Sequence, residues 1–472
     1  MSKVLILNPP CKSIYKNAEV KVTAPYKSVT LAPAVMATPL LKRGINVKII
    51  DFNLPENTKE KLVKTLKLDK PDFVAITFNT ALFHIVKELC RIIKGVNNSI
   101  TIIGGGAHTS SMPKETLKES LIDISVIGEG DFTLLDVLSK NIDKVEGICY
   151  KKGNNIVVNK PRKEIKNLDK LPLPAWQLYD LDRYKLPKIV CRKNPLGFLE
   201  TSRGCVFDCS YCNKSVFGKN FRYKSVKRIM EEIRYMLEIG FKEINIVDDG
   251  FTTVIERAKE VCRRIIKEKL NFSWQLMNGI RVDKVDKELF YLLKKAGCYR
   301  VAFGIESGNT KVLEDIRKNT KLSQVRNAVK WANRAGIETW GHFILGLPKD
   351  NEETMYQTIN FAKSLKLTLA NFTICIPYPG TPLFRDYDKR GLIKSKNWKD
   401  YNLYEPRELY KHPYLDWDII YKYYRKAYRS FYFRPGFIIR RGMFSIKQGT
   451  FLEDLRVFLL LFLRYFQSFF TR

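Results

Sequence analysis

The sequence predicts an α/β protein with two successive domains built on parallel sheets, followed by a helical C-terminal region. Two stretches carry this prediction, because short apolar runs alternate with helix-length amphipathic segments in residues 1–145 and again in residues 196–395. A third observation concerns residues 396–472, where the strand-like runs stop and basic and aromatic residues become frequent. Residues 146–195 separate the two repeats.

The first domain is expected to be a doubly wound parallel sheet. Its strand candidates are VLILN, VKIID, FVAITF, SITIIGGG and ISVIGEG, and each is followed by about one helix of sequence. No GxGxxG follows the first strand, which disfavours a nicotinamide dinucleotide as ligand. Ligands of such sheets bind at the carboxyl ends of the strands. In this chain those ends carry Asn8, Asp51, Asn79, Gly104 to Gly106 and Glu129-Gly130.

Residues 146–195 predict a hairpin followed by a linker. The stretch ICYKKGNNIVVN turns around Gly153-Asn154-Asn155, and these residue types favour a tight turn between two strands. The next stretch, LPLPAWQLYDLDRYKLP, contains several prolines that interrupt regular structure. We therefore expect the second domain to begin near residue 196.

The second domain is expected to form a full or partial (β/α) barrel. Its strand candidates are GFLETS, EINIVDD, FSWQLMN, RVAFGIES, TWGHFILG and NFTICIPY, with amphipathic segments such as SVKRIMEEIRYMLEIG between them. Barrel enzymes carry their chemistry at the carboxyl ends of the strands. The stretch GCVFDCSYCN, residues 204–213, follows the first of these strands. Its cysteines are therefore expected at the mouth of the barrel.

Cys205, Cys209 and Cys212 are spaced for binding a metal centre. The ten cysteines of the chain are scattered, and no secretory signal pattern precedes MSKVLILNPP, which predicts a reduced, cytoplasmic setting without disulfides. Structural zinc requires four ligands, and neither a fourth cysteine nor a histidine lies nearby in the sequence. A [4Fe-4S] cluster held by three cysteines leaves one iron open to a further ligand. The spacing favours the cluster, with zinc as the alternative.

Several motifs resemble a known enzyme family. CVFDCSYC is similar to the C-x3-C-x2-C loop of the radical S-adenosylmethionine superfamily, including an aromatic residue, Tyr211, before the last cysteine. VDDGFT, NGIRVD, FGIESGN, HFILGLP and PYPGTPL resemble the strand-end motifs that follow this loop. In the first domain, IIGGGAHTSSMPKETL and SVIGEGDFTLLDVL resemble a Rossmann-like cobalamin-binding domain. The whole sequence is thus similar to the cobalamin-binding radical S-adenosylmethionine enzymes, class B methyltransferases included.

This resemblance implies an enzyme with a [4Fe-4S] cluster, S-adenosylmethionine and cobalamin as cofactors. Cys205, Cys209 and Cys212 would ligate the cluster and carry its catalysis. The expected reaction is methyl transfer to an unactivated carbon of a hydrophobic small molecule or lipid, with an electron donor such as flavodoxin or ferredoxin as partner. The alternative is radical cyclisation or rearrangement without net methyl transfer. An alternative of another class is a non-catalytic, nucleic-acid-associated metal-binding module.

The resemblance also implies contacts with S-adenosylmethionine. Arg281 and Ser307 are expected to bind its carboxylate, and Asp248, Asp249 and Glu306 its ammonium or ribose hydroxyls. For Asp248 and Asp249, capping of the next helix is the competing interpretation. The remaining expected contacts come from the aromatic residue of the cysteine motif and from glycines that allow close backbone approach: Tyr211, Gly304 and Gly346.

For cobalamin, the resemblance implies a base-off cofactor without a histidine ligand. The D-x-H-x-x-G motif that supplies such a histidine is absent, because LNPPCKSIYKN follows the first strand. His108 lies instead in the glycine loop, where a hydrogen-bonding role is the competing interpretation. The expected contacts with the corrin or its nucleotide tail are Gly104, Gly105, Gly106, His108, Thr109, Glu129 and Gly130.

Residues 396–472 are expected to be helical, basic and aromatic. Eight basic residues, ten aromatic residues and no acidic residue lie between Ile419 and Leu452. Two amphipathic helices are expected on either side of Arg434-Pro435-Gly436, with LEDLRVFLLLFLRYFQSFF in the second. A helical cap packed on the core is the favoured explanation, and peripheral membrane contact is the other. The net charge of +33 comes without a nucleic-acid-binding motif, so no specific nucleic acid is expected as partner.

Overall fold

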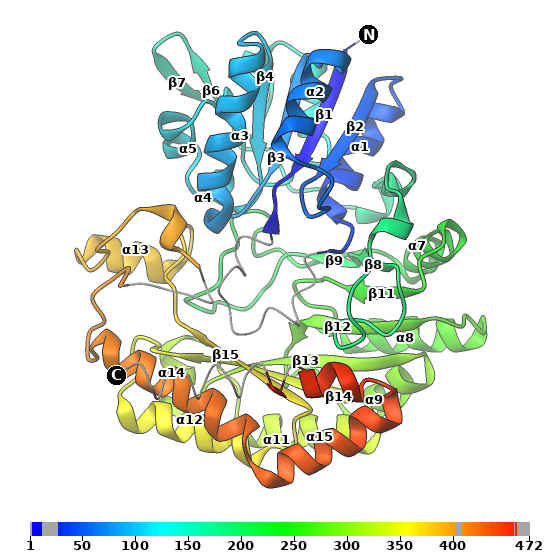
Figure 1. Ribbon diagram of the computed structural model, residues 1–472, viewed down its shortest axis with the longest axis vertical. Helices are drawn as coiled ribbons and strands as arrows, with labels where there is room; N and C mark the ends of the chain where they lie inside the picture. Colours follow the sequence, from blue (N-terminus) through cyan, green and yellow to red (C-terminus); the bar gives the residue numbers. More distant parts are fainter. Residues whose placement is uncertain (1, 12–26, 403–407, 457, 460–472) are drawn as a thin grey trace.

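The protein is described from a computed structural model that covers residues 2–11, 27–402, 408–456 and 458–459. Figure 1 shows the N-terminal sheet domain standing above a second sheet domain. The arrowhead of the first strand points down toward the second domain, so the carboxyl ends of the N-terminal parallel strands face it. The C-terminal helices run along the far side of the second domain.

The N-terminal sheet has seven strands in the order β2-β1-β3-β4-β5-β6-β7. Strands β1 to β5 run parallel, whereas β6 and β7 are antiparallel additions at one edge. The parallel sheet is the one expected from the sequence, and β6 and β7 form the expected hairpin. The strands are β1 (Lys3–Asn8), β2 (Asn46–Asp51), β3 (Phe73–Thr77), β4 (Thr101–Gly105), β5 (Ile124–Val126), β6 (Ile148–Lys152) and β7 (Asn155–Val158).

Alternation along β1 explains why helices cover both faces of this sheet. Leu5 and Leu7 belong to the largest core cluster of the molecule, whereas Val4 and Ile6 belong to a separate cluster on the opposite face. A strand that is buried on both faces is typical of a doubly wound sheet. The helices of this domain are α1 (Leu31–Leu41), α2 (Lys59–Asp69), α3 (Phe83–Val96), α4 (Ala107–Ser111), α5 (Pro113–Glu119) and α6 (Thr133–Ser139), with 3-10 turns η2 (Thr80–Leu82) and η3 (Ile142–Lys144).

The linker after β7 packs against both domains. Trp176 is fully buried and its ring meets that of Phe241 edge to face, with 5.3 Å between the ring centroids. The amide of Ala175 donates to the carbonyl oxygen of Ala34 in α1 at 3.0 Å. These contacts hold the first domain to the start of the second. The linker itself contains only 3-10 turns within its described residues: η4 (Leu168–Lys170), η5 (Trp176–Leu178) and η6 (Leu181–Arg183).

The second domain is a partial barrel of six parallel strands in the order β15-β14-β13-β12-β11-β8. This architecture confirms the predicted fold class. A separate hairpin, β9 (Ser202–Arg203) with β10 (Arg222–Tyr223), follows the first barrel strand. The barrel strands are β8 (Leu196–Leu199), β11 (Glu243–Ile246), β12 (Ser273–Ile280), β13 (Cys298–Glu306), β14 (Glu338–Leu345) and β15 (Leu369–Ile374).

Helices cover the outer face of the barrel sheet. In α7, Ser225 caps the first turn by accepting a hydrogen bond from the Arg228 amide, and Gly240 ends the helix with a φ of 115°. These are the residues at which the sequence pattern begins and ends. The outer helices are α7 (Val226–Ile239), α8 (Ile255–Lys267), α9 (Lys287–Lys295), α10 (Thr310–Asp315), α11 (Leu322–Arg334) and α12 (Glu352–Ser364).

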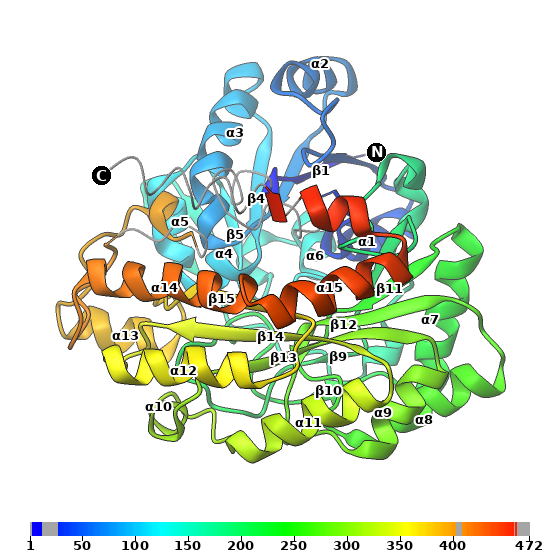
Figure 2. The same ribbon diagram turned by 60° about the horizontal axis from the view of Figure 1, so that its bottom comes forward.

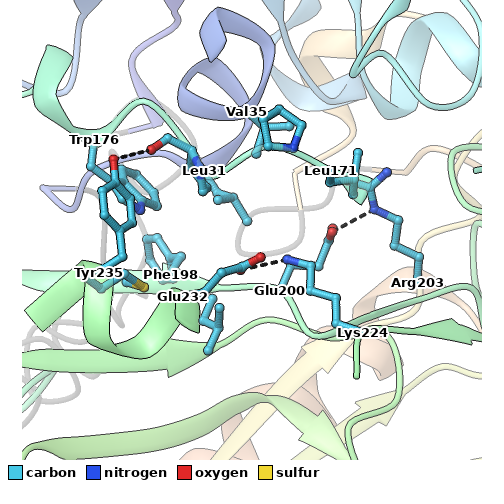
Figure 3. Close-up of a pocket in the computed structure, with 14 residues that line it drawn as sticks. Leu31, Val35, Leu171, Trp176, Phe198, Glu200, Arg203, Lys224, Glu232 and Tyr235 are labelled. Carbon is cyan, nitrogen blue, oxygen red and sulfur yellow. Dashed lines mark hydrogen bonds and ion pairs between the residues drawn. The ribbon is translucent and has the colours of Figure 1, made fainter. Parts of the chain in front are cut away.

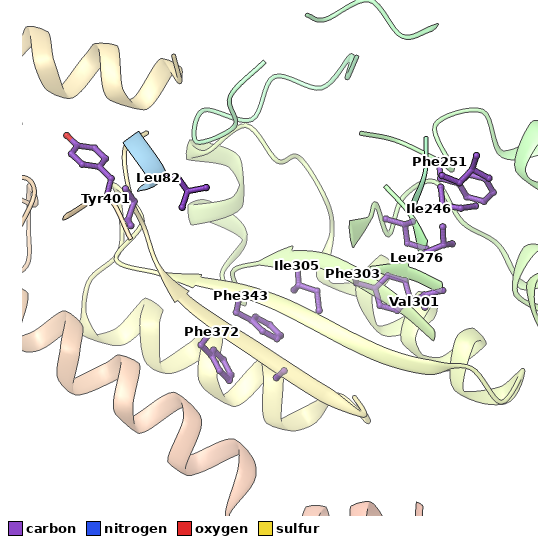
Figure 4. Packing of buried hydrophobic residues seen from close by; sticks show 14 of the residues in the cluster. Leu82, Ile246, Phe251, Leu276, Val301, Phe303, Ile305, Phe343, Phe372 and Tyr401 are labelled. Carbon is purple, nitrogen blue, oxygen red and sulfur yellow. The ribbon is translucent and has the colours of Figure 1, made fainter. Parts of the chain in front are cut away.

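The two faces of β13 to β15 differ in burial. One face carries large apolar side chains that pack beneath the outer helices, and Figure 4 shows Phe303, Ile305, Phe343 and Phe372 among them. Toward the carboxyl ends of the same strands, alternate residues are only half-buried. We call this second side, together with Met277 of β12, the inner face, and it is formed by Met277, Gly304, His342, Ile344, Asn371 and Thr373. The inner face is therefore the side of the sheet with room for a ligand.

The chain after β15 forms helices that complete the barrel. α14 packs on β15, where the hydroxyls of Tyr428 and Tyr432 donate to the carbonyl oxygens of Phe372 and Ala370. The predicted break near Pro435 is present, but the second helix is α15 and it ends at Gly449, whose φ of 65° stops it. Much of the predicted second helix lies outside the described residues. These elements are α13 (Pro382–Lys389), η7 (Trp398–Asp400), α14 (Trp417–Tyr432) and α15 (Pro435–Gln448).

Candidate functional site

The three predicted cluster ligands lie on one loop at the carboxyl edge of the barrel. We call residues 204–221 the cysteine loop, and the β9-β10 hairpin closes its base. Gly204 opens the loop with a φ of 79°, and a Cβ there would lie 2.2 Å from the carbonyl oxygen of Asn220. Only glycine fits such a position. The loop follows β8, where the sequence analysis expected it.

The three thiols are close enough to affect one another. Cys209 is 8% exposed, and Cys205 and Cys212 are half-buried. Burial raises the pKa of the Cys212 thiol to about 12, and the neighbouring Cys209 and Cys205 add to the shift. No three His, Cys, Asp or Glu side chains among the described residues converge on one point as ligands of a single metal ion. A [4Fe-4S] cluster binds each thiolate through a different iron, so three thiols spread along one loop fit it.

A buried polar group formed by Tyr211, Glu306 and Lys318 lies beside the cysteine loop. Lys318 Nζ donates to Glu306 Oε1 at 2.9 Å. The Tyr211 hydroxyl also bonds to this carboxylate, and burial together with the Glu306 charge raises the pKa of that hydroxyl well above its usual value. Glu306 ends β13 with a φ of 66°, which is strained for a residue with a side chain. Strain at the carboxyl end of a barrel strand is typical of a functional site.

The two adjacent aspartates after β11 have different surroundings. Asp248 is 4% exposed, and its carboxylate accepts hydrogen bonds from the backbone and side chain of Thr201 and from the Ser202 hydroxyl. Asp249 is exposed and accepts one hydrogen bond, from the Gly204 amide at 3.0 Å. Asp248 therefore anchors the chain that leads into the cysteine loop. Asp249 is the member of the pair whose side chain is open to a ligand.

Arg281 and Gly304 lie near the same buried group. The Arg281 guanidinium pairs with Asp283 and is 3.6 Å from the ring centroid of Phe207, which belongs to the cysteine loop. A Cβ on Gly304 would lie 2.7 Å from Glu306 Oε1, so the glycine makes room for that carboxylate. Both residues, which are predicted to contact S-adenosylmethionine, thus lie on the side of the inner face next to the cysteine loop.

Two predicted contacts with S-adenosylmethionine point away from the inner face. Ser307 is fully buried, and its hydroxyl bonds to the Thr358 hydroxyl of α12 at 3.0 Å. Gly346 has a φ of 70°, and a Cβ there would lie 3.3 Å from Ile420 of α14. Both residues therefore pack against outer helices. Successive residues of a strand point to opposite faces of the sheet, and these two lie on the side that the helices cover. The geometry therefore gives no support to a ligand contact by either residue.

The glycines after β4 lie at the carboxyl edge of the N-terminal sheet. Gly106 has a φ of 108°, and a Cβ there would lie 2.5 Å from the carbonyl oxygen of Phe78, so only glycine fits. A Cβ on Gly104 would lie 2.9 Å from the Ile122 side chain, whereas Gly105 has nothing closer than 3.9 Å. A Cβ on Gly105 would therefore make only an ordinary contact with Val126, so this glycine is less crowded than its two neighbours. Gly130 is similarly uncrowded, with its nearest neighbours at 3.8 Å.

His108 does not reach this edge. It is fully buried, its ring centroid is 4.4 Å from that of Phe83, and its Nδ1 bonds to the Thr80 hydroxyl at 3.1 Å. Burial lowers the pKa of His108 to about 3, so the imidazole is neutral. Thr109 is also fully buried, and its hydroxyl donates to the Gly106 carbonyl at 3.0 Å. Both residues hold the glycine loop in shape, which agrees with the hydrogen-bonding interpretation of His108.

Glu129 belongs to a buried ion network that joins the two domains. Arg203, at the base of the cysteine loop, donates to Glu129 at 2.9 Å and to both oxygens of Asp131 at 2.8 Å. Arg222, at the other end of the loop, also pairs with Glu129. Figure 3 shows Arg203 pairing with Glu200 beside a small cavity of about 20 Å³ between the domains. Glu129 thus fixes the loop base, and its carboxylate is not free for the corrin.

A second set of contacts brings the glycine edge to the third cysteine. Asn213 Nδ2 donates to Ser111 Oγ at 2.9 Å, and the same hydroxyl lies 2.9 Å from Ser215 Oγ. Ser111 ends the short helix that follows the glycine loop, and Asn213 directly follows Cys212. A Cβ on Gly128, after β5, would lie 3.7 Å from the Val216 carbonyl oxygen. The cysteine loop and the carboxyl edge of the N-terminal sheet therefore face each other at hydrogen-bonding distance.

Comparison with known proteins identifies both halves of this site. The model of the radical SAM superfamily matches residues 199–362, and that of the B12 binding domain matches residues 20–138. An uncharacterized methyltransferase of Pyrococcus horikoshii is 36% identical over 460 residues, which cover 93% of this chain and 97% of the relative. The chain belongs to the cobalamin-binding radical S-adenosylmethionine enzymes. It is therefore an enzyme with a [4Fe-4S] cluster, S-adenosylmethionine and cobalamin as cofactors.

Other relatives of this radical enzyme carry different names. Cytidylyl-2-hydroxyethylphosphonate methyltransferase of Streptomyces wedmorensis is 28% identical, over 83% of this chain and 82% of the relative. Anaerobic magnesium-protoporphyrin IX monomethyl ester cyclase of Cereibacter sphaeroides is 26% identical, over 79% of this chain and 62% of the relative. In each case the match covers more than three quarters of this chain.

Solved structures support the same fold. The cobalamin-dependent S-adenosylmethionine radical enzyme OxsB, with aqua-cobalamin bound, matches 98% of this chain and 72% of its own at a TM-score of 0.73 and 18% identity. The radical S-adenosylmethionine methyltransferase TsrM of Kitasatospora setae matches 83% of this chain and 75% of its own at a TM-score of 0.66, also with 18% identity. At this identity the likeness concerns the fold.

Sequence reasoning missed several residues that shape the site of this radical enzyme. Arg203 and Arg222 enclose the cysteine loop, Asp131 pairs with Arg203, and Lys318 pairs with the predicted site residue Glu306. Apart from the local Arg203–Glu200 pair, these partners are 12 to 93 positions apart, and no local sequence pattern indicates pairs of that separation. The one signal in the sequence is position, because Arg203 directly precedes the glycine that opens the loop. His342 was quoted only as part of a motif, yet it lies on the inner face.

Proposed function

We propose that this enzyme transfers a methyl group to an unactivated carbon of a hydrophobic small molecule or lipid-like substrate. The observation that carries the proposal is the approach of the cysteine loop to the glycine edge through Asn213, Ser111 and Ser215. A substrate bound beside these contacts would be within reach of the cofactors of both domains. The names of the Pyrococcus and Streptomyces relatives, both methyltransferases, agree with this reaction.

The inner face supports an apolar substrate. Met277 and Ile344 contribute thioether and aliphatic surface, and Gly304 adds no side chain at all. Three polar side chains share this face: Thr373, and His342 and Asn371, which are next to each other across β14 and β15. Burial lowers the pKa of His342, so its ring is neutral and offers a hydrogen bond without a charge. Apolar surface combined with a small number of placed polar groups is typical of small-molecule sites.

Different residues of the chain would bind the different cofactors. When bound, the cluster with S-adenosylmethionine supplies a radical that removes hydrogen, and the corrinoid supplies the methyl group. Cys205, Cys209 and Cys212 would hold the cluster. Asp249 is open to the ammonium or ribose of S-adenosylmethionine, and Glu306, fixed by Lys318, lies beside the same loop. A flavodoxin-like or ferredoxin-like donor would supply the electron that the cluster needs.

Radical cyclisation is the second candidate, because the Cereibacter relative is named a cyclase. The two reactions differ in their products. Methyl transfer forms S-adenosylhomocysteine together with 5′-deoxyadenosine, whereas cyclisation without net methyl transfer forms 5′-deoxyadenosine alone.

The test is turnover of the anaerobically purified holoenzyme with S-adenosylmethionine that carries a deuterated methyl group, in the presence of an apolar extract of the source cells. We expect both coproducts and a labelled, lipid-soluble product detected by mass spectrometry. The Cys209→Ala variant is the matched control and should give neither coproduct. Deoxyadenosine without S-adenosylhomocysteine would overturn methyl transfer, and label found only in water-soluble products would overturn the apolar substrate.

A further inference from the structure

Exposed apolar side chains are concentrated at the C-terminal end of the described chain. Seventeen large hydrophobic residues are exposed among the described residues, and eight of them lie within residues 438–459. The other nine are spread singly over the two sheet domains, as is normal for a globular protein. A contiguous apolar patch of this kind marks an interaction surface.

The exposed residues form a stripe with helical spacing. On α15, Ile439 is 61%, Met443 56% and Ile446 64% exposed, and these positions share one side of a helix. The separate helical segment after Gly449 also carries exposed apolar residues, Leu452, Leu455 and Leu459, of which Leu452 is 78% exposed. We call the stripe formed by Ile439, Met443 and Ile446 the α15 surface.

The neighbouring helix shows that this exposure is specific to α15. In α14, Tyr424, Tyr428 and Phe431 are buried against the barrel, and the exposed positions carry charges. In α15 only Phe437 and Ser445 are buried. A cavity of about 350 Å³ lies where α15 meets the first residues of β14, so the helix does not pack closely on the barrel along its whole length. Figure 2 shows α14 and α15 end to end along the outside of the molecule.

The charges around the α15 surface are positive. Lys447 is exposed beside the stripe and Arg456 on the helical segment that follows α15, and no acidic residue lies between Ile419 and Leu452. Arg440 is turned to the barrel, where its guanidinium donates to the Leu367 carbonyl oxygen at 3.0 Å. Asp454 is one of two acidic residues that follow, and it pairs with Arg441 at 2.8 Å, so much of its charge is already compensated. Long basic side chains beside an apolar stripe can extend toward phosphate groups while their stems stay with the apolar residues.

We infer that the α15 surface docks on an anionic lipid bilayer, lying in the interface with its apolar stripe toward the acyl chains. Basic charge favours this occupant over a second copy of the chain, because a symmetric dimer would bring two sets of cations together, whereas anionic headgroups neutralise them. No helix of the described chain is long and apolar enough to cross a bilayer. The docking is thus a surface contact, and it does not depend on the reaction proposed above.

The test is flotation of the full-length holoenzyme with vesicles. We expect binding to vesicles of phosphatidylcholine mixed with phosphatidylglycerol, weaker binding to phosphatidylcholine alone, and loss of binding as salt is raised. The double variant Met443→Asp/Ile446→Asp should reduce the partition coefficient by about tenfold or more, because it places two charges in the apolar stripe.

The matched control is Leu68→Asp on α2, where an isolated leucine is 68% exposed. This variant adds the same kind of charge elsewhere and should bind vesicles like the unchanged protein. Iron content and melting temperature verify that each variant is folded. Absence of vesicle binding by the unchanged protein, or equal binding by the double variant, would refute the docking. A concentration-dependent dimer that the double variant abolishes, without any vesicle binding, would assign the surface to a second copy.

Discussion

At the carboxyl edge of the N-terminal sheet, polar side chains are buried and bond to one another, whereas the polar side chains on the inner face of the barrel are only half-buried. Asn8 donates to Asp51 at 2.8 Å and the Tyr184 hydroxyl donates to the same carboxylate at 3.2 Å. On the barrel side, His342, Asn371 and Thr373 remain partly open. We infer that the edge of the N-terminal sheet is a rigid frame whose backbone faces its ligand, whereas the inner face of the barrel offers side chains to its ligand.

The glycine edge and the cysteine loop depend on each other through buried charges. Glu129 and Asp131 of the N-terminal domain bind Arg203 at the base of the cysteine loop. A rigid joint at this point fixes where the cofactors of the two domains stand relative to each other. Preorganisation of this kind reduces the reorganisation that a reaction requires.

The largest effect is expected from Cys209→Ala, which removes one expected cluster ligand from the cysteine loop of the barrel. The variant should lose nearly all cluster iron after anaerobic purification, because a [4Fe-4S] cluster needs its three thiolates. Cys262→Ala on α8 is the control, since this cysteine is buried in the core away from the loop. Iron and sulfide analysis measures both. Iron retained by Cys209→Ala at the unchanged level would refute the ligand assignment.

A smaller but still large effect is expected from Arg203→Met, which breaks the joint between the two regions. The change leaves Glu129, Asp131 and Glu200 in a buried place with one cation fewer. Removal of one partner from a buried charge network costs about 3–5 kcal/mol of unfolding free energy. The control is Lys48→Met, which breaks an exposed pair with Asp69 and should cost less than about 1 kcal/mol.

Thermal unfolding with and without bound corrinoid measures the effect of Arg203→Met. If the two variants lower the melting temperature equally, the network does not join the domains in the way described here. Retention of iron by Arg203→Met would show that the loop still assembles its cluster when the joint is weakened.

Two neighbouring glycines, Gly105 and Gly106, test which part of the N-terminal edge is structural and which part faces the cofactor. Gly106→Ala should lower stability by about 1–3 kcal/mol, because a side chain at a φ of 108° is strained and its Cβ meets the Phe78 carbonyl. Gly105→Ala should leave the melting temperature nearly unchanged, since its Cβ would make only an ordinary contact with Val126 at 3.9 Å. The Gly105 variant should nevertheless bind less corrinoid, measured by absorbance after reconstitution. Full corrinoid binding by Gly105→Ala would mean that this glycine does not face the cofactor.

The elements of the fold were predictable where a short pattern determines them. Alternation and turn residues were enough to predict both parallel sheets, and three cysteines within eight positions were enough to predict the cluster loop. Side-chain direction at strand ends was harder, because a shift of one residue changes the face. Glu306 and Ser307 are adjacent, yet the first bonds to Lys318 beside the loop and the second to Thr358 of a helix. Pairs between distant segments leave no local signal.

The C-terminal helices show the same difference between features that a local pattern predicts and features that depend on the tertiary fold. The aromatic and basic pattern predicted two helices and offered two explanations for them, a cap on the core and a membrane contact. The structure shows that α14 packs on β15, as expected of a cap. For α15 the pattern alone could not decide, because its apolar residues suit a core and a bilayer equally well. Burial, which depends on the tertiary fold, separates the two helices.

The smallest effect is expected from the pH dependence of His108, which tests how rigid the frame is. Burial lowers the pKa of His108 to about 3, whereas an unfolded histidine titrates near 6.5. Between these values the unfolded chain takes up a proton that the folded chain refuses, so stability is full above about pH 6.5 and falls as pH decreases, by up to about 1.4 kcal/mol per pH unit. In the variant His108→Phe, which keeps an aromatic ring beside Phe83, the melting temperature should fall less between about pH 7 and pH 5. An equal fall in both proteins would mean that this loop opens and lets the imidazole take up its proton.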